Sequence, residues 1–270
     1  MTMLHARQIE HLLPSGWNEI IGNRSLKAHL QSMVRDMAWP RQGTGVNTLV
    51  LGDSRSGKTS AVDFAIKAMV CWKLDHNTLQ PCRECGVCQQ RGLTDRVTSN
   101  DLFMLDAPAN GLCFTPINGN AVTAGELDDL ILEARQHGSR RHLVYIDEIE
   151  GLCRRHLDHA LYKAVEQHLN ITWILSTATT KGLATMFINR FTKVSTEPPS
   201  VPAMAVFLAQ VCRRPDVEIS WDDGATFLLL AGRSRQLVGL ALKCLAKAKL
   251  NEGFLTRALV EDFPFDEDEP

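Results

Sequence analysis

Several features that define other classes of protein are missing from this sequence of 270 residues. No apolar run approaches the ~18 residues that a membrane-spanning helix needs, and the opening residues Met1–His5 do not begin the apolar core of a signal peptide. Internal repeats and low-complexity tracts are missing too. We therefore expect a folded protein that is neither secreted nor inserted in a membrane, and we predict a cytoplasmic location.

A strong net charge is also missing, because the formal net charge is −2 at pH 7. This excludes a global basic field, which would indicate binding to nucleic acid over a large surface. Any contact with DNA must therefore come from a local patch. With 44% hydrophobic residues the chain can bury a core, and its length fits one large domain or a larger and a smaller one.

The eight cysteines do not form the even pattern of an extracellular disulfide framework. Four of them, Cys71, Cys82, Cys85 and Cys88, follow the spacing C-x10-C-x2-C-x2-C. Tight C-x2-C pairs let thiolates converge on one Zn²⁺, and four protein ligands leave no open position, so we predict a structural zinc site. His76 lies between the first two cysteines and is an alternative ligand. Packing of free cysteines and a redox C-x2-C pair are the other interpretations.

The segment from Gly52 to Thr59 reads G-x4-G-K-S/T, the pattern of a phosphate-binding loop. The apolar run 47–51 before it suits a buried strand, and residues 60–70 after it have the apolar spacing of a helix. A chance turn is the alternative. Because strand, loop and helix follow in the order that such a loop requires, we predict binding of a nucleoside triphosphate.

The residue types of this loop explain how it would hold phosphates. Gly52 and Gly57 let the backbone curl so that its N–H groups point at phosphate oxygens, and the following helix adds its positive end. Lys58 would reach the β- and γ-phosphates, and the Thr59 hydroxyl would bind Mg²⁺. The predicted ATP contacts of the loop also include Ser56 and Ser60.

The apolar stretch 142–146 is followed directly by Asp147 and Glu148. In a protein with a phosphate-binding loop, Asp147 would hold Mg²⁺, directly or through water, and Glu148 would orient and polarise the attacking water. An ordinary strand end is the alternative for so short a pattern. Its place downstream of the loop favours the catalytic interpretation, so we predict ATP hydrolysis.

Between these two motifs, residues 101–106 are a strand candidate. Residues 107–122 are rich in Gly, Pro and Asn, and we predict a loop there. Thr123 followed by Glu126 fits a capping box, which predicts a helix over 123–135.

After Glu148 we expect a helix over 156–169, a strand over 171–180 and a short helix over 183–188. Arg154 and Arg155 precede the first of these helices, and they are interpreted either as solvated surface residues or as DNA contacts. Prolines then mark a boundary. The domain organisation that we predict is a nucleotide-binding base domain over 1–199 with a zinc module at about 71–88, a helical lid domain over 200–263, and an acidic tail over 264–270.

In these motifs the chain resembles the gamma/tau-type ATPase subunit of bacterial DNA polymerase III clamp loaders, within the AAA+ class. The most specific match is the phosphate-binding loop followed by the four-cysteine spacing, because that family carries a zinc module at this place. Asp147–Glu148 matches the family's second ATP motif, and the resemblance runs from about Trp17 to about Phe263. It implies an α/β fold with a parallel sheet flanked by helices, a zinc module inserted after the P-loop helix, and a small helical lid.

The resemblance also implies roles for two arginines. Arg190 matches the arginine of the family's Ser-Arg-Cys, which reaches the ATP of a neighbouring subunit, although here it could be an ordinary surface arginine. Arg235 matches the arginine at the start of the lid helix that contacts the γ-phosphate of its own subunit. Its alternative is a residue in the first turn of an amphipathic helix, where a cation is slightly disfavoured.

The chain departs from the family's pattern at four places. Ser-Arg-Cys is replaced by Asn-Arg-Phe, and Ala178 occupies the polar sensor position, beside Thr177, which we retain as an ATP contact. The stretch 107–122 is longer than expected, and the sequence ends after the lid without the helical collar that holds the loader's ring together.

We therefore expect an ATP-hydrolysing AAA+ protein that uses ATP, Mg²⁺ and Zn²⁺. It would act in a homo- or hetero-oligomer of AAA+ subunits on DNA or on a DNA-bound partner such as a sliding clamp. One alternative is a nucleotide-gated assembly module of the kind used in transposition, helicase loading or defence. Another is a subunit that binds ATP without hydrolysing it.

Overall fold

The computed structural model describes residues 14–37, 45–54, 56–90, 92–93, 105–107, 111–136, 141–166, 170–234 and 238–263. Their contacts form two compact units. The larger unit contains the described residues of 25–53 and 58–196, and the smaller unit contains those of 14–24, 54–57 and 197–263. The predicted boundary after residue 199 stays a prediction.

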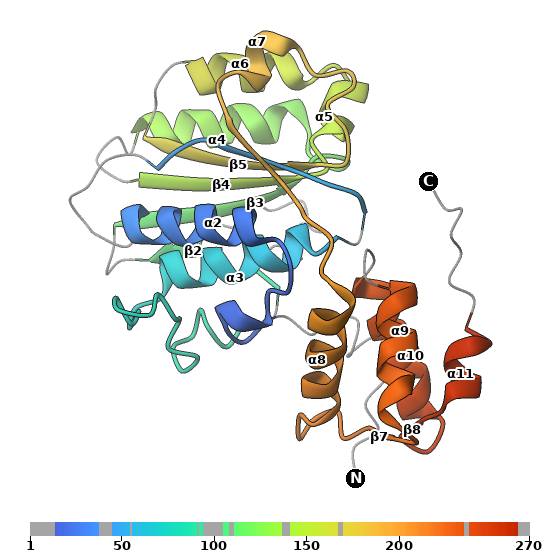
Figure 1. The fold of residues 1–270 in the computed structure, drawn as a ribbon. Helices are drawn as coiled ribbons and strands as arrows, with labels where there is room; N and C mark the ends of the chain where they lie inside the picture. The colour runs from blue at the N-terminus through green and yellow to red at the C-terminus, as the bar shows by residue number, and fades with distance from the viewer. Residues whose placement is uncertain are drawn as a thin grey trace. The chain divides into compact units, whose positions relative to one another are not determined.

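A six-stranded sheet forms the centre of the larger unit, in the order β2-β3-β4-β5-β1-β6 (Figure 1). In the part of the chain that the structure describes, β3, β4, β5, β1 and β6 are paired in parallel, in that order, and only the edge strand β2 runs antiparallel to its neighbour. The strands are β1 (Thr48–Leu51), β2 (Leu105–Ala107), β3 (Leu112–Asn118), β4 (Arg141–Asp147), β5 (Ile171–Thr177) and β6 (Thr192–Ser195).

Helices cover both faces of this sheet (Figure 1). On one face lie α2 (Arg24–Met37) and α3 (Lys58–Val70). On the other lie α4 (Ala124–Gln136), α6 (Asp158–Glu166) and α7 (Thr185–Ile188). All seven residues of β5 are buried, which explains why central strands read as continuous apolar runs rather than as alternating ones. The predicted α/β fold with a parallel sheet between helices is therefore confirmed.

The predicted loop over 107–122 is wrong in its middle part, because seven of these sixteen residues form β3. β3 pairs with β4 over its whole length, and six of its seven residues are buried. Pro116 and the Asn-Gly pair at 118–119 suggested a loop. The antiparallel partner β2 pairs only with Leu112–Phe114 among the described residues, so this pairing does not reach Pro116. Pro116 therefore lies where β3 has no described antiparallel partner, a place where a missing N–H is tolerated. In the strand predicted over 101–106, residues 101–104 lie outside the described residues.

The stretch after β4 differs in detail from the prediction. A short helix α5 (Glu150–Arg154), which was not predicted, precedes α6. The helix predicted over 156–169 begins at Asp158. The predicted capping box is confirmed: the Thr123 N–H donates to the Glu126 carboxylate at 2.7 Å, and the Glu126 N–H donates to Thr123 Oγ1 at 3.3 Å.

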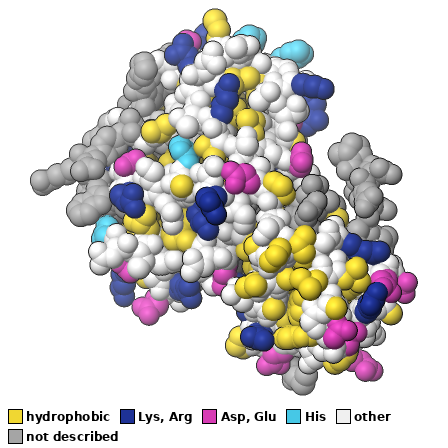
Figure 2. All heavy atoms as spheres, viewed as in Figure 1, with side chains coloured by type: hydrophobic (Ala, Val, Ile, Leu, Met, Phe, Trp, Pro, Cys, Tyr) yellow, Lys and Arg dark blue, Asp and Glu magenta, His cyan; other side chains and the backbone are white. Residues whose placement is uncertain are grey.

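The smaller unit is mainly helical. It contains the 3₁₀ turn η1 (Trp17–Glu19), α8 (Val201–Cys212), β7 (Ser220–Trp221), α9 (Gly224–Ser234), α10 (Val238–Leu250), β8 (Phe254–Leu255) and α11 (Arg257–Glu261). Its core of Met, Phe, Leu and Val side chains lies between these helices. Hydrophobic side chains also gather on its surface in the view of Figure 2. Val206 on α8 and Leu228 on α9 are each more than half exposed.

The amino-terminal turn belongs to this smaller unit. The Glu19 carboxylate accepts hydrogen bonds from the Ser15 N–H at 2.7 Å and from the guanidinium of Arg214, which follows α8. α9 ends at Ser234, and Arg235, which the resemblance places at the start of the lid helix, lies outside the described residues, as does the tail 264–270. Among the helices that the structure describes, none is long and apolar enough to cross a membrane.

Candidate functional site

The phosphate-binding loop leaves β1 at its carboxyl end and enters α3 at Lys58. Gly52 packs against the end of β6, where a Cβ atom would lie 1.8 Å from Thr196 Oγ1, so no larger residue fits. Gly57 has a φ of +86°, a conformation that side chains other than glycine rarely adopt. The Gly52 N–H donates to the Thr177 carbonyl at 3.2 Å, which fixes the loop to the neighbouring strand β5.

The Lys58 ammonium lies folded over the first residues of this loop. Its Nζ donates to the carbonyls of Gly52 at 2.5 Å and Asp53 at 2.7 Å. Burial lowers the pKa of Lys58, and nearby carboxylates act in the opposite direction. These carboxylates are those of Asp147, Glu150, Asp53 and Glu148.

Asp147 ends β4 beside the start of α3. The Thr59 hydroxyl donates to Asp147 Oδ2 at 3.2 Å, so the two predicted magnesium-binding residues lie together. The Ser176 hydroxyl donates to Asp147 Oδ1, and the buried Tyr145 hydroxyl donates to Ser176 Oγ at 3.3 Å. Burial raises the pKa of Tyr145 well above its usual value, so this phenol stays neutral and keeps its donor. Carboxylate and hydroxyl oxygens are ligands that suit Mg²⁺, so the arrangement fits the ion.

Glu148 follows in a left-handed conformation with a φ of +55°. Its side chain is exposed, and the Asn120 amide donates to its Oε2. The guanidinium of Arg154 in turn donates to Asn120 Oδ1 at 2.8 Å. Sequence reasoning did not find Asn120, because it lies in the stretch interpreted as a loop and belongs to no motif.

Glu150 is a further carboxylate that the sequence did not indicate. Its Oε1 accepts a hydrogen bond from the Ala178 N–H at 3.5 Å, and its Oε2 is buried with no hydrogen-bond partner among the described residues. Since this carboxylate also acts on the pKa of Lys58, it is one of four acidic side chains near the loop lysine, with Asp53, Asp147 and Glu148.

Two other residues of the predicted ATP contacts have local partners. The buried Thr177 hydroxyl donates to the Thr179 carbonyl at 2.7 Å and accepts from the Thr179 N–H at 3.1 Å. Within the smaller unit, the Asn23 side chain donates to the Ser56 carbonyl at 3.3 Å and accepts from the Glu197 N–H at 2.7 Å. Asn23 is therefore a second residue near the loop that sequence reasoning had not assigned to the site.

Arg190 follows α7, and its guanidinium pairs with the Glu166 carboxylate of α6 at 2.8 Å. Both side chains are about half exposed, at 43% and 50%. The described contacts therefore join Arg190 to α6 and not to the phosphate-binding loop.

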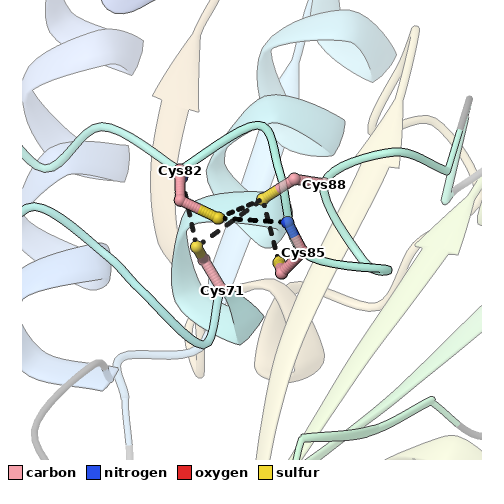
Figure 3. Close-up of side chains that lie close together, drawn as sticks. All are labelled: Cys71, Cys82, Cys85 and Cys88. Carbon is pink, nitrogen blue, oxygen red and sulfur yellow. Dashed lines mark hydrogen bonds between the residues drawn. The ribbon is translucent and has the colours of Figure 1, made fainter.

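The four clustered cysteines lie together directly after α3, with their sulfurs turned toward one another (Figure 3). All four Sγ atoms are within 4.8 Å of one another. Cys88 Sγ lies 3.4 Å from that of Cys85, 3.5 Å from that of Cys71 and 3.9 Å from that of Cys82. Tetrahedral zinc with Zn–S bonds of about 2.3 Å separates its sulfurs by about 3.8 Å, so this donor set fits the ion.

The surroundings of Cys71 favour its thiolate. Backbone N–H groups of Lys73 and Cys82 donate to Cys71 Sγ at 3.4 and 3.2 Å. The hydrogen bond from the Cys88 thiol lowers the pKa of Cys71 to about 5, and the same contact raises the pKa of Cys88. All eight cysteines are free of disulfides. His76, the alternative ligand, is exposed and does not belong to the cluster.

No protein-family model and no curated protein sequence matches this chain. Solved structures do match it. Two variants of RuvB from Thermotoga maritima each superpose with a TM-score of 0.60 at 15% identity, covering 95% and 93% of this chain and 72% and 71% of theirs. The AAA domain of FIGL-1, solved with ADP, superposes with a TM-score of 0.57 at 13% identity over 94% of this chain and 84% of that domain. Identities this low show the fold alone, and the chain therefore has the fold of the AAA+ ATPases, with a cluster of four cysteines placed directly after its phosphate-loop helix.

Proposed function

We propose that this protein binds ATP with Mg²⁺ and hydrolyses it. The observation that carries the proposal is the contact between Thr59 and Asp147, since it joins the two halves of a predicted magnesium site from α3 and β4. Lys58 lies at the same place, and Glu148 directly follows Asp147. These residues were predicted from two separate motifs, and the fold brings them to the same end of the sheet.

In the proposed reaction each side chain has one task. The loop N–H groups and the Lys58 ammonium bind the phosphate oxygens, and Thr59 and Asp147 would hold Mg²⁺. When bound, Mg²⁺ neutralises the charge that develops on the phosphates. Glu148 orients a water molecule toward the γ-phosphorus and accepts its proton, while the bond from this phosphorus to the bridging oxygen breaks and leaves ADP.

Replacing Glu148 by glutamine is expected to lower ATP turnover by about 10²-fold or more while ATP still binds, because the amide orients water poorly and cannot accept its proton. Turnover is measured by phosphate release and affinity by equilibrium binding of ATP. Glu261→Gln, an exchange of the same kind in α11 of the smaller unit, is the matched control and should change neither. Unchanged turnover in Glu148→Gln would contradict the proposed role, and a wild-type protein without turnover would leave only the ATP-binding interpretation.

We propose further that Cys71, Cys82, Cys85 and Cys88 bind a structural zinc ion. The support is the donor set itself: four sulfurs at spacings that match tetrahedral zinc, with backbone N–H groups directed at two of them. Since Cys71 directly follows α3, which begins with Lys58 and Thr59, this ion would anchor the far end of the helix that carries the nucleotide-binding residues.

The active site would be completed by a second AAA+ subunit. Arg190 is proposed to reach the γ-phosphate of a neighbouring subunit, and the lid arginine Arg235 to contact the ATP of its own. What supports the first role is the match to the family's arginine motif together with the exposure of this side chain. The ion pair with Glu166 does not prevent it, because exposed pairs of this kind are worth at most about 1 kcal/mol.

As the cellular role, we propose a clamp-loader-like motor that acts on DNA, on the strength of the phosphate-binding loop followed by the cysteine spacing. A sliding clamp together with primed DNA is then expected to stimulate ATP turnover several-fold, because nucleotide hydrolysis would be coupled to release of the loaded clamp. Phosphate release is measured with clamp alone, DNA alone and both. No stimulation by either would rule out this role. An ATP-dependent increase of native mass without stimulation would instead support a nucleotide-gated assembly module.

A further inference from the structure

Arg155, which the sequence left as either a surface residue or a DNA contact, lies next to the candidate site and is engaged there. Its guanidinium donates to three backbone carbonyls, those of Gly119 at 2.5 Å, Val122 at 2.6 Å and Gly151 at 3.2 Å. The first two belong to the segment Asn118–Val122, which connects β3 to α4 and is called the 118–122 turn below. Arg155 therefore joins this turn to α5.

The turn is packed tightly against the residues that follow β4. The Gly119 N–H donates to the Asp147 carbonyl at 2.7 Å, and a Cβ atom on Gly119 would lie 2.3 Å from the Glu148 carbonyl oxygen. On the other side, a Cβ atom on Gly151 would lie 2.6 Å from the Gly119 carbonyl oxygen. Since backbone faces backbone at both glycines, a small shift of the turn changes the surroundings of Glu148.

The turn also carries the group that holds the Glu148 carboxylate. The Asn120 amide donates to Glu148 Oε2, and among the described residues no other donor to this carboxylate is recorded. The Glu148 side chain is otherwise exposed, so it would rotate freely without this contact. Its orientation thus depends on Asn120, and the place of Asn120 depends on the turn and on the hydrogen bond that its Oδ1 accepts from Arg154.

We propose that Arg155 is a positioning residue for Glu148: it holds the 118–122 turn, and the turn holds Asn120 against the Glu148 carboxylate. This rests on the proposed role of Glu148 in ATP hydrolysis. Arg155 itself contacts neither ATP nor water in the proposed reaction. With one carboxylate oxygen held by the Asn120 amide, the other is left to orient the attacking water.

The geometry requires a guanidinium at this place. Its planar fork directs donors at several carbonyls at once, whereas a lysine ammonium is a single point charge with a flexible stem. Lysine could keep one of the contacts to Gly119 and Val122 but not the pair of them. Arg155→Lys should therefore retain part of the effect of arginine, and Arg155→Ala none.

The test is a double-mutant cycle between Arg155 and Asn120, measured by steady-state ATP turnover and by ATP affinity. Arg155→Ala is expected to lower kcat about tenfold and to leave KM within about twofold, because misplacing Glu148, which does not bind the phosphates, costs rate more than binding. Arg155→Lys should fall between this variant and the wild type. In an Asn120→Ala background, Arg155→Ala should have no further effect on kcat.

Two results would overturn this inference: an undiminished kcat in Arg155→Ala, or an equal loss of kcat with and without Asn120, which would indicate a general structural role. Should Arg155→Ala not fold, Arg155→Lys in the same cycle decides the question. Arg35→Ala, an exposed arginine in the last turn of α2, is the matched control and should leave kcat unchanged. Turnover in the wild type that is lost in Glu148→Gln would uphold the proposed function whatever the outcome for Arg155.

Discussion

Replacing Cys88 by serine is expected to abolish stoichiometric zinc binding and to unfold the segment around residues 71–90. Cys88 Sγ lies within hydrogen-bond distance of the other three sulfurs, so this position is central to the cluster. Structural zinc of this type contributes apparent binding energies of about 10–16 kcal/mol, which is the same size as or larger than the whole stability of a typical domain. The expected effect on stability is therefore the largest of any single change considered for this chain.

Metal content and unfolding are the two measurements for this site. Intact wild-type protein should contain about one equivalent of zinc per chain, and removal by a chelator should lower its thermal midpoint. Cys153→Ser, a cysteine outside the cluster, is the matched control and should keep both its zinc and its midpoint. Less than about half an equivalent of zinc in the wild type would count against the assignment of all four ligands.

Replacing Arg190 by alanine is expected to lower ATP turnover by a factor on the order of 10³ or more, since an arginine supplied to a transferring phosphoryl group is worth that much. ATP affinity should change little, because the predicted binding residues of the loop belong to the same chain. Phosphate release is measured at a protein concentration at which subunits associate. Arg35→Ala again serves as the control for loss of an exposed arginine.

Mixing two inactive variants tests whether Arg190 acts on a neighbouring subunit. Arg190→Ala retains Glu148, and Glu148→Gln retains Arg190, so a mixed oligomer contains some sites with both residues intact. Turnover should therefore reappear on mixing if the arginine acts in trans. Full turnover of Arg190→Ala by itself would show that this arginine has no role in catalysis. Its ion pair with Glu166 would then be an ordinary surface contact.

Much of the site could be predicted because its chemistry is concentrated in short segments. The loop from Gly52 to Thr59 is contiguous, and its flanking strand and helix are visible in the apolar pattern. The cysteine spacing was equally informative, because two-residue gaps restrict where thiolates can point. Both motifs adopt the expected local structure: Lys58 begins α3, and the four sulfurs converge.

Other residues near the site could not be predicted, because each is a single polar residue without a spacing pattern. Ser176 contacts Asp147 only because β4 and β5 are neighbours in the sheet. Asn120 reaches Glu148 because β3 pairs with β4, and this strand was misread as a loop. Composition rich in Gly, Pro and Asn describes the ends of β3 well, but the pairing that makes it a strand comes from β4, which follows much later in the chain.

The amino-acid sequence by itself determined the α/β class, the strand, loop and helix around Gly52–Thr59, the Asp147–Glu148 pair and the cysteine cluster, because local motifs and apolar periodicity are properties of neighbouring residues. The tertiary structure alone decided which polar groups surround that loop. It brought Thr59 to Asp147 and paired Arg190 with Glu166. It also placed the Asn120 amide on the Glu148 carboxylate and the Arg155 guanidinium on the turn that carries Asn120. Such contacts depend on strand order and on the turns between strands, and side chains far apart in the sequence meet only when the whole sheet is assembled.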